Sequence, residues 1–208
     1  MAWNTKMPLI AILRGITPDE IHTHIPLLIE AGFDAIEIPL NSPDWQISIQ
    51  QAVQHYGHQA LIGAGTVLRV ENVDQLAELG CRLIVTPNIH TGVIRKAIEY
   101  GMTVCPGCFT ATEAFTALEA GSPNLKIFPS ATLGPDYVKA LKAVLPEDIS
   151  VFAVGGVTPE NLHTYLNAGC VGAGLGGDLY KAGQSAERTK QQAEAFIHAY
   201  QQWQQQQQ

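Results

Sequence analysis

Positive charge is scarce in this sequence of 208 residues. Lys and Arg number 12 against 19 Asp and Glu, which gives a formal net charge of −7, and no segment gathers the basic residues into a cluster. Nucleic acids and anionic membranes are bound mainly by clustered Lys and Arg side chains. The sequence therefore argues against both partners and predicts that any bound anion is held by a few positioned groups.

The N-terminus also lacks a long hydrophobic run. Its apolar run spans only residues 8–13 and ends at Arg14. A signal peptide has an apolar core of about 7 to 15 residues, and a membrane-spanning helix needs about 20. We therefore expect a cytoplasmic protein.

Cysteine is rare, and its spacing forms no complete zinc or redox motif. Cys105 and Cys108 have the C-x-x-C spacing, but they end an apolar stretch instead of opening a helix, and Cys81 and Cys170 supply no second pair. The seven histidines offer no ligand cluster among the apolar runs. We expect plain cysteines at strand ends, no catalytic metal and no cofactor.

What the sequence does contain is one pattern repeated eight times: a short apolar run, a turn, an amphipathic stretch and usually a glycine. The runs start at residues 8, 34, 61, 83, 103, 125, 150 and 172. Their spacing, from 20 residues (83 to 103) to 27 residues (34 to 61), suits one strand and one helix per unit. Eight such units predict an α/β fold, a single-domain (β/α)8 TIM barrel over residues 1–200.

An open doubly wound sheet is the alternative architecture. It would want a glycine-rich fingerprint after the first strand, where this chain has Leu13-Arg-Gly-Ile16. The barrel is therefore favoured. Residues 201–208 form a glutamine-rich tail that we predict to be frayed.

Three charged residues fall within or directly after the predicted strands. They are Arg14, Glu37 and Lys126, and the polar Thr66 ends the third strand. Alternation along the strands allows all four to face the barrel lumen. Both faces of a barrel sheet are shielded from water. A buried charge is costly unless it lines a site at the C-terminal mouth of the barrel. These residues are therefore the candidate active site.

Lys126 is the only one of seven lysines that lies within an apolar strand. One interpretation is a structural ion pair with Glu37; the other is a Schiff-base lysine with Glu37 transferring protons. A lysine at the ordinary pKa of about 10.4 is neutral only once in roughly 2,500 molecules at pH 7. Desolvation beside Arg14 would lower that pKa, whereas an ionised Glu37 would raise it.

Two glycine clusters follow the seventh and eighth predicted strands. They are Val154-Gly-Gly-Val157 and Gly174-Leu-Gly-Gly177. Many barrels bind phosphate at this position on exposed backbone N–H groups. The clusters therefore predict a phosphorylated substrate.

Several motifs together resemble the KDPG/KHG family of class I Schiff-base aldolases, which cleave 2-keto-3-deoxy-6-phospho sugar acids. The shared motifs are residues 12–15, 63–66, 86–88, 106–107, 126–129 and 154–157, together with Glu37. Within the family the chain is most similar to the members that act on the galactonate epimer. Residues 37–43 lack the arginine-threonine ending of the gluconate enzymes, and Val154 stands where those have threonine.

The resemblance implies a homotrimeric lyase of galactonate degradation that releases pyruvate and glyceraldehyde 3-phosphate. Lys126 would form the iminium, and Glu37 would move protons. Arg14 and Thr66 would hold the carboxylate end of the substrate. The other implied substrate-binding residues are Pro87, Val154, Gly155, Gly156, Gly176 and Gly177, of which the four glycines would hold the phosphate. The family commonly has serine at the position of Gly177, so one hydroxyl contact is missing here.

Other functions fit the same residues. One is an aldolase for the gluconate epimer or for 4-hydroxy-2-oxoglutarate. A second is a phosphosugar isomerase or epimerase in which Lys126 and Glu37 act without covalent chemistry, and a third is a non-catalytic phosphate-ligand binding protein. All of them would use the glycine clusters, so the clusters do not discriminate among these functions.

Overall fold

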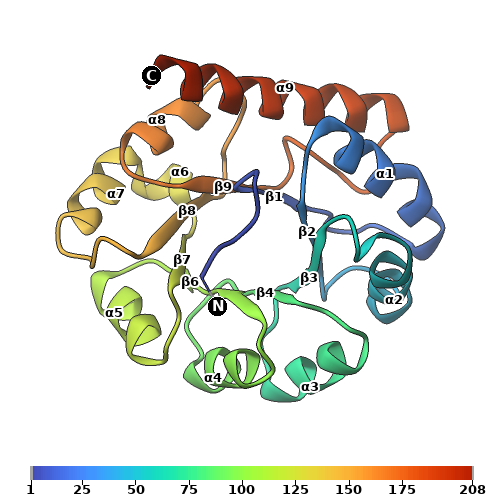
Figure 1. Cartoon of the computed structure of the whole chain (residues 1–208), viewed down its shortest axis with the longest axis horizontal. Coiled ribbons are helices and arrows are strands. Elements are labelled where there is room, and N and C mark those ends of the chain that lie inside the picture. Colours follow the sequence, from blue (N-terminus) through green and yellow to red (C-terminus); the bar gives the residue numbers. More distant parts are fainter. Residues whose placement is uncertain (1, 208) are drawn as a thin grey trace.

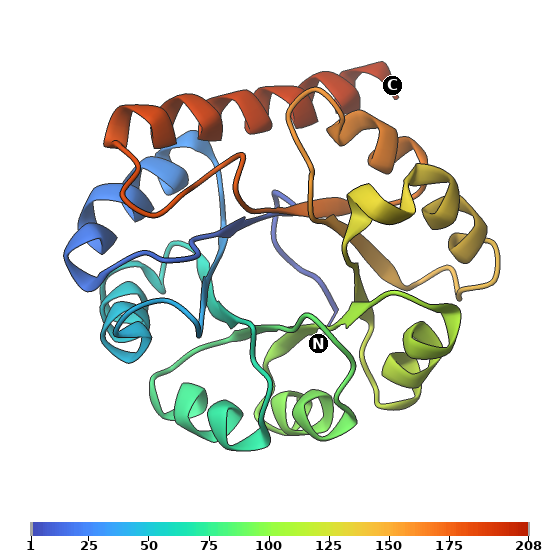
Figure 2. The ribbon, with the colours of Figure 1, turned by 180° about the vertical axis from the view of Figure 1, so that it is seen from behind.

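The computed structural model describes residues 2–207, which form a barrel of parallel strands ringed by helices (Figure 1, Figure 2). The strands are β1 (Leu9–Ile12), β2 (Ala35–Pro39), β3 (Leu61–Gly65), β4 (Leu83–Val85), β5 (Thr103–Cys105), β6 (Gly107–Cys108), β7 (Asn124–Ile127), β8 (Ser150–Val154) and β9 (Gly172–Leu175). The helices are η1 (Pro18–Glu20), α1 (Ile21–Ala31), α2 (Trp45–Tyr56), α3 (Val70–Glu78), α4 (Thr91–Glu99), α5 (Ala111–Glu119), α6 (Ser130–Leu133), α7 (Pro135–Lys142), α8 (Leu162–Asn167) and α9 (Ala186–Gln206). The predicted (β/α)8 barrel is confirmed.

A single proline explains why the sheet has nine strand segments and not eight. The strand order is β5-β4-β3-β2-β1-β9-β8-β7-β6, so its two ends are β5 and β6. These two are consecutive in the chain and are separated only by Pro106, which has no N–H to donate. The Pro106 carbonyl still accepts a hydrogen bond from the Lys126 N–H at 2.9 Å. Together, β5 and β6 form the fifth strand position and close the barrel.

Alternation along the strands separates two apolar clusters. Leu9, Ala11, Leu125 and Ile127 belong to the large cluster between sheet and helices. A smaller cluster fills the lumen and consists of Ile10, Ile12, Ala35, Leu83, Val85, Cys105, Phe152 and Val154. This arrangement confirms the predicted lumen-facing positions of Glu37 and Lys126, which share the alternation of the lumen residues and are buried, whereas Arg14 lies beyond the end of β1 and is exposed.

The N-terminal segment crosses one opening of the barrel (Figure 1). Trp3 packs there against Phe152, with their ring centroids 4.5 Å apart. The apolar lumen is therefore covered at the end where the strands begin, and the site lies at the other end.

The glutamine-rich tail differs from the prediction. Helix α9 continues through Gln206, whereas residues 201–208 were expected to be frayed. Trp203 provides the physical reason, because its indole Nε1 donates a hydrogen bond to Asn167 Oδ1 at 2.8 Å and so ties the last turns to α8. The division of the chain at residue 200 stays a prediction, and residue 208 lies outside the described residues.

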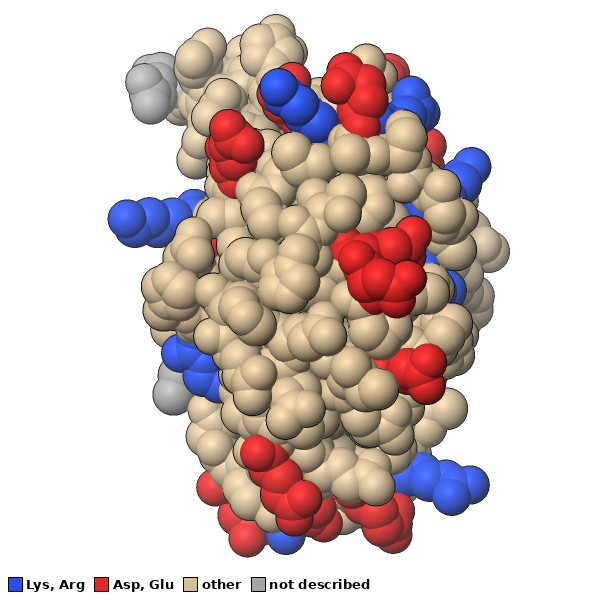
Figure 3. Space-filling model, turned by 90° about the vertical axis from the view of Figure 1, so that its right-hand side faces the viewer, with Lys and Arg blue, Asp and Glu red and all other residues tan. Residues whose placement is uncertain are grey.

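All four cysteines are free and buried; Cys105 and Cys108 end β5 and β6, whereas Cys81 and Cys170 precede β4 and β9. Among the described residues, no helix combines the length and apolar character needed to cross a membrane. On the face of the molecule shown in Figure 3, Lys and Arg side chains are scattered singly and form no basic patch.

Candidate active site

A lysine and a glutamate lie inside the barrel. Strand β7 places Lys126 in the lumen with 5% of its surface exposed, and β2 places Glu37 there with 2% exposed. Three strands, β1, β9 and β8, separate β2 from β7 in the sheet, so the two side chains approach from opposite walls. Because both side chains are almost fully buried beside the apolar lumen cluster, they have lost most of their hydration.

Lys126 and Glu37 do not form the ion pair that was one interpretation of the sequence. Within residues 2–207, the only ion pairs closer than 4.0 Å join Lys96 to Asp74 and to Glu99. Glu37 Oε2 is buried and has no hydrogen-bond partner among the described residues. Such an unpartnered oxygen costs about 1–3 kcal/mol, and more when it is charged. A stabilising ion pair therefore does not explain why these groups are buried.

Gly65 makes room for the Glu37 carboxyl group. A β-carbon on Gly65 would overlap Glu37 Oε1 and Oε2. The two residues lie on neighbouring strands, where Pro39 of β2 pairs with Gly65 of β3. The absence of a side chain at Gly65 is therefore what lets the carboxyl group lie flat against the barrel wall.

Burial shifts the pKa of both groups toward their neutral forms. Desolvation raises the pKa of Glu37 to about 7, against the opposing pull of the positive charges on Lys126 and Arg14. Desolvation also lowers the pKa of Lys126; the charges of Glu37 and Cys105 oppose this, and Arg14 adds to it. The Cys105 thiol itself has a pKa raised to about 12 by burial. The site thus shifts the Lys126 amine toward its neutral form, while the Glu37 carboxyl group titrates near neutrality.

Arg14 is held at the mouth by two neutral oxygens. Its Nη1 donates to Asn41 Oδ1 at 2.6 Å and to Thr66 Oγ1 at 3.2 Å. No carboxylate forms an ion pair with Arg14 in residues 2–207. Its charge therefore remains available for an anionic ligand group.

Thr66 reaches this position in a different way from the predicted one. Ile62 and Ala64, which share its alternation on β3, belong to the helix-facing cluster and not to the lumen cluster. The assignment of Thr66 to the lumen by alternation was therefore wrong. Strand β3 ends at Gly65, and Thr66 has a left-handed φ of 53°, rare for a β-branched residue. This turn redirects its hydroxyl to Arg14.

A cavity of about 330 Å³ opens from Lys126 toward the glycine clusters. Its wall includes the predicted residues Arg14, Lys126, Val154, Gly155, Gly156, Gly176 and Gly177. It also includes Phe128, whose ring centroid lies 4.6 Å from Lys126 Nζ, and Asp178, Tyr180 and Lys181. The cavity thus joins the buried amine to two glycine loops.

The glycine loop after β8 requires residues without side chains. Gly155 and Gly156 have φ values of 98° and 73°, which side chains rarely adopt. A β-carbon on Gly156 would also lie 2.5 Å from Ala131 Cβ. This backbone therefore comes close to α6 and leaves its peptide groups accessible to the cavity.

Three predicted site residues do not line this cavity. Glu37 lies beneath it in the lumen, and Thr66 lines a neighbouring depression with Asn41 and Leu40. Pro87 follows β4, and its backbone lies against Gly107. Sequence analysis missed Asn41 and Phe128; the latter shares the alternation of Lys126 and could have been found, whereas the Asn41 contact depends on the loop after β2.

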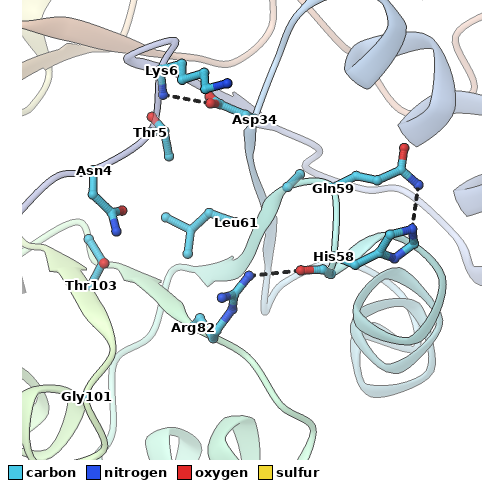
Figure 4. Close-up of a pocket in the computed structure, with 12 residues that line it drawn as sticks. Asn4, Thr5, Lys6, Asp34, His58, Gln59, Leu61, Arg82, Gly101 and Thr103 are labelled. Atoms are coloured by element: carbon cyan, nitrogen blue, oxygen red, sulfur yellow. Dashed lines mark hydrogen bonds between the residues drawn. The ribbon is translucent and has the colours of Figure 1, made fainter.

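A second cavity, of about 370 Å³, lies at the opposite end of the barrel (Figure 4). Leu61 and Thr103, which begin β3 and β5, line it. Two of its charged groups already have partners: the Asp34 carboxylate accepts the backbone N–H of Lys6 at 2.8 Å, and Arg82 donates to the Gly57 carbonyl at 2.9 Å. This cavity does not adjoin Lys126 and is not the candidate site.

No three His, Cys, Asp or Glu side chains gather as a possible metal site among the described residues. The absence of a catalytic metal and of a cofactor stays an expectation. These groups define a class: a barrel enzyme with a desolvated lysine, a second buried ionisable group and an arginine at the mouth that forms no ion pair among the described residues.

Comparisons with known proteins place the chain within that class. Residues 2–194 match the family of KDPG and KHG aldolases. The chain is 71% identical over 200 residues to 2-dehydro-3-deoxy-6-phosphogalactonate aldolase of Escherichia coli K12, covering 96% of this chain and 98% of that protein. It also resembles the solved "Native KDPGal structure", with a TM-score of 0.97 and 70% identity over 99% of this chain and 100% of that one. A chain of a cube-shaped cage, designed by fusing symmetric oligomeric domains, is 70% identical with a TM-score of 0.97, covering 98% of this chain and 75% of that one.

The chain belongs to the KDPG and KHG aldolase family. It is therefore an aldolase, a lyase that breaks a carbon–carbon bond in a phosphorylated keto acid. The isomerase and the non-catalytic binding protein are excluded as interpretations.

The raised pKa of Glu37 predicts a pH-dependent cost of folding. The unfolded carboxyl group ionises near its ordinary value of 4.5, whereas the folded one keeps its proton up to about 7. The free energy of unfolding is therefore highest below pH 4.5, and it falls as the pH rises from 4.5 toward 7. Glutamine does not titrate. The free energy of unfolding of Glu37→Gln, measured relative to that of wild type, should therefore increase by up to about 3 kcal/mol from pH 5 to pH 8.

Urea unfolding of both proteins at the two pH values measures this gain. Glu119→Gln, on the exposed surface of α5, is the matched control and should show no such gain. If the free energies of unfolding of Glu37→Gln and wild type differed by the same amount at pH 5 and at pH 8, the raised pKa of Glu37 would be contradicted.

Proposed function

We propose that the protein cleaves 2-dehydro-3-deoxy-6-phosphogalactonate to pyruvate and glyceraldehyde 3-phosphate through a Schiff base on Lys126. The observation that carries the proposal is the burial of this lysine, 5% exposed and with a lowered pKa, at the base of a cavity that ends in two glycine loops. The substrate assignment is supported by the 71% identical relative of that name.

In the proposed reaction, the neutral Lys126 amine attacks the C2 ketone of the substrate. Loss of water forms the iminium. Removal of the C4 hydroxyl proton then breaks the C3–C4 bond, whose electron pair moves to C3 and the iminium to give an enamine. Protonation of C3 and addition of water release pyruvate and regenerate the amine, so the cycle needs no external oxidant or reductant.

Glu37 is the proposed proton carrier. A pKa of about 7 means that its carboxyl group gives up and accepts a proton near neutral pH. Its Oε2 has no protein partner in the described residues, which leaves this oxygen free for a substrate hydroxyl or a water molecule. Proton transfer at the C4 hydroxyl and later at C3 requires this reversible behaviour.

The remaining roles follow from the two ends of the cavity. Arg14, supported by Thr66, binds the substrate carboxylate, since its guanidinium forms no internal ion pair in residues 2–207. The backbone N–H groups of the glycine pairs after β8 and β9, Gly155-Gly156 and Gly176-Gly177, bind the phosphate. Pro87, which follows β4 and does not line this cavity, stays a predicted substrate-binding residue. The substrate thus lies between a fixed cation and two backbone loops.

Two further properties belong to the proposal. We propose a homotrimer, supported by the similar chain in a cage built from symmetric oligomeric domains. We also propose a cytoplasmic location, which fits four free thiols and a phosphorylated substrate.

Trapping with borohydride tests the Schiff base. Incubation with pyruvate followed by borohydride should inactivate the enzyme irreversibly, because reduction fixes the iminium as a stable secondary amine. Peptide mapping should place the adduct on Lys126 and on none of the six other lysines.

Glu37→Gln separates covalent chemistry from proton transfer. This variant should still form the trapped adduct but lose turnover by roughly 10²- to 10⁴-fold, the usual contribution of a proton-transfer group. An active and unmodified wild-type enzyme after treatment would overturn the Schiff base, and near-normal turnover of the variant would assign the proton to another group.

Val154 gives a prediction about the epimer. It ends β8 at the cavity wall with 5% exposure, and it offers no hydrogen bond to the C4 hydroxyl, the group whose configuration distinguishes the two epimers. Wild type should prefer the galactonate epimer, and Val154→Thr should shift the ratio of kcat/KM values about tenfold toward the gluconate epimer. That shift lies within the roughly 1–3 kcal/mol at stake for a buried polar group that gains or lacks a partner.

Val151→Thr is the control for this substitution. It buries the same hydroxyl on the helix-facing side of β8 and should leave the epimer ratio unchanged. A wild-type preference for the gluconate epimer would refute the substrate assignment and leave the aldolase chemistry intact.

A further inference from the structure

The phosphate end of the cavity has few side chains that could hold a phosphate. Four of its wall positions are glycines: 155, 156, 176 and 177. At Gly177 the family commonly carries serine, so this chain lacks a hydroxyl there. The two other basic residues of the cavity wall, Arg14 and Lys126, serve the carboxylate and the ketone in the proposed function. A phosphate dianion at this end therefore needs another source of charge.

Lys181 lies at this end of the cavity. It lines the same wall as the four glycines. Its ε-carbon is 3.8 Å from the position that a β-carbon on residue 177 would take, and apart from residues 176–178 no other atom among the described residues comes within 4 Å of that position. The end of the lysine side chain thus occupies the space over Gly177 that a longer side chain would reach.

The backbone of Lys181 is fixed by its neighbours. Its N–H donates to Gln184 Oε1 at 3.3 Å, and its carbonyl accepts the Gln184 N–H at 3.0 Å. Gln184 Nε2 in turn donates to the Leu179 carbonyl at 2.9 Å and to Thr189 Oγ1 at 3.0 Å. The loop after β9 is therefore tied to α9, and the origin of the lysine side chain is set before any ligand arrives.

Asp178 makes a cation here more important. Its exposed carboxylate belongs to the same cavity wall and would repel a phosphate. The Lys181 ammonium offsets that charge. A lysine ammonium also binds phosphate as a compact point charge with three donors, so it does not require a fixed fork geometry.

We propose that Lys181 binds the substrate phosphate in this enzyme and takes the place of the hydroxyl missing at Gly177. The proposal rests on the proposed function, since it assumes that the phosphorylated end of the substrate lies against the glycine loops. Lys181 is a binding residue, remote from the bonds that change. Loss of this side chain should therefore weaken binding of the substrate and of the transition state equally, which raises KM without lowering kcat.

The test compares Lys181→Met with wild type on the phosphorylated substrate and on 2-dehydro-3-deoxygalactonate, which has no phosphate. The variant should raise KM for the phosphorylated substrate about tenfold, within the range of hydrogen bonds to charged groups. Its kcat, its kinetics on the unphosphorylated compound and its pyruvate–borohydride adduct should be unchanged. Lys190→Met, on the exposed surface of α9, is the matched control and should behave as wild type.

A second variant tests the replacement directly. Gly177→Ser has room, because the nearest atom is at ordinary contact distance, and in the Lys181→Met background it should recover most of the lost affinity. An unchanged KM in Lys181→Met, or an equal rise for both substrates, would overturn the assignment. Wild-type enzyme that forms no pyruvate adduct would instead refute the proposed function, so the two failures are distinguishable.

Discussion

The structure depends on holding an amine and a carboxyl group in one lumen, shielded from water, without an ion pair between them. Lys126 and Glu37 are almost fully buried, and they form no ion pair within 4.0 Å. A closed pair would hold both groups in their charged forms, whereas separated groups in an apolar lumen shift toward neutrality. Gly65 provides the room that keeps the carboxyl group against its own wall. The barrel thus maintains a reactive arrangement that is costly for stability.

The electrostatic environment differs between the base of the cavity, its mouth and its glycine loops. At its base, desolvation dominates and the amine tends toward neutrality. At the mouth, Arg14 keeps its charge and is oriented by Asn41 and Thr66, two neutral partners that do not compensate it. The glycine loops line the far part of the cavity, and backbone N–H groups of this kind can bind an anion without a fixed charge. One substrate with a ketone, a carboxylate and a phosphate matches this sequence of environments.

Much of the fold could be predicted because a strand has a period of two and each β/α unit has a recurrent length. The same alternation identified Lys126, Glu37 and Arg14, since a charged residue among lumen positions is costly unless it lines a site. It failed at Thr66, where a left-handed turn beyond β3 reverses the direction of the side chain. Two features could not be predicted: the separation of Lys126 from Glu37 arises only when the barrel closes, and the approach of Asn41 to Arg14 depends on the loop after β2. The helical tail depends likewise on one long-range contact of Trp203.

A direct titration of Lys126 tests the central claim. Lysine labelled with ¹³C at the ε-carbon gives one NMR signal for each residue, and the signal missing from Lys126→Met assigns this one. The wild-type midpoint should lie below the ordinary value of 10.5, and Glu37→Gln should lower the pKa of Lys126 further, since the charge of Glu37 raises it. A midpoint at 10.5 in wild type, or one that does not respond to Glu37→Gln, would contradict the account.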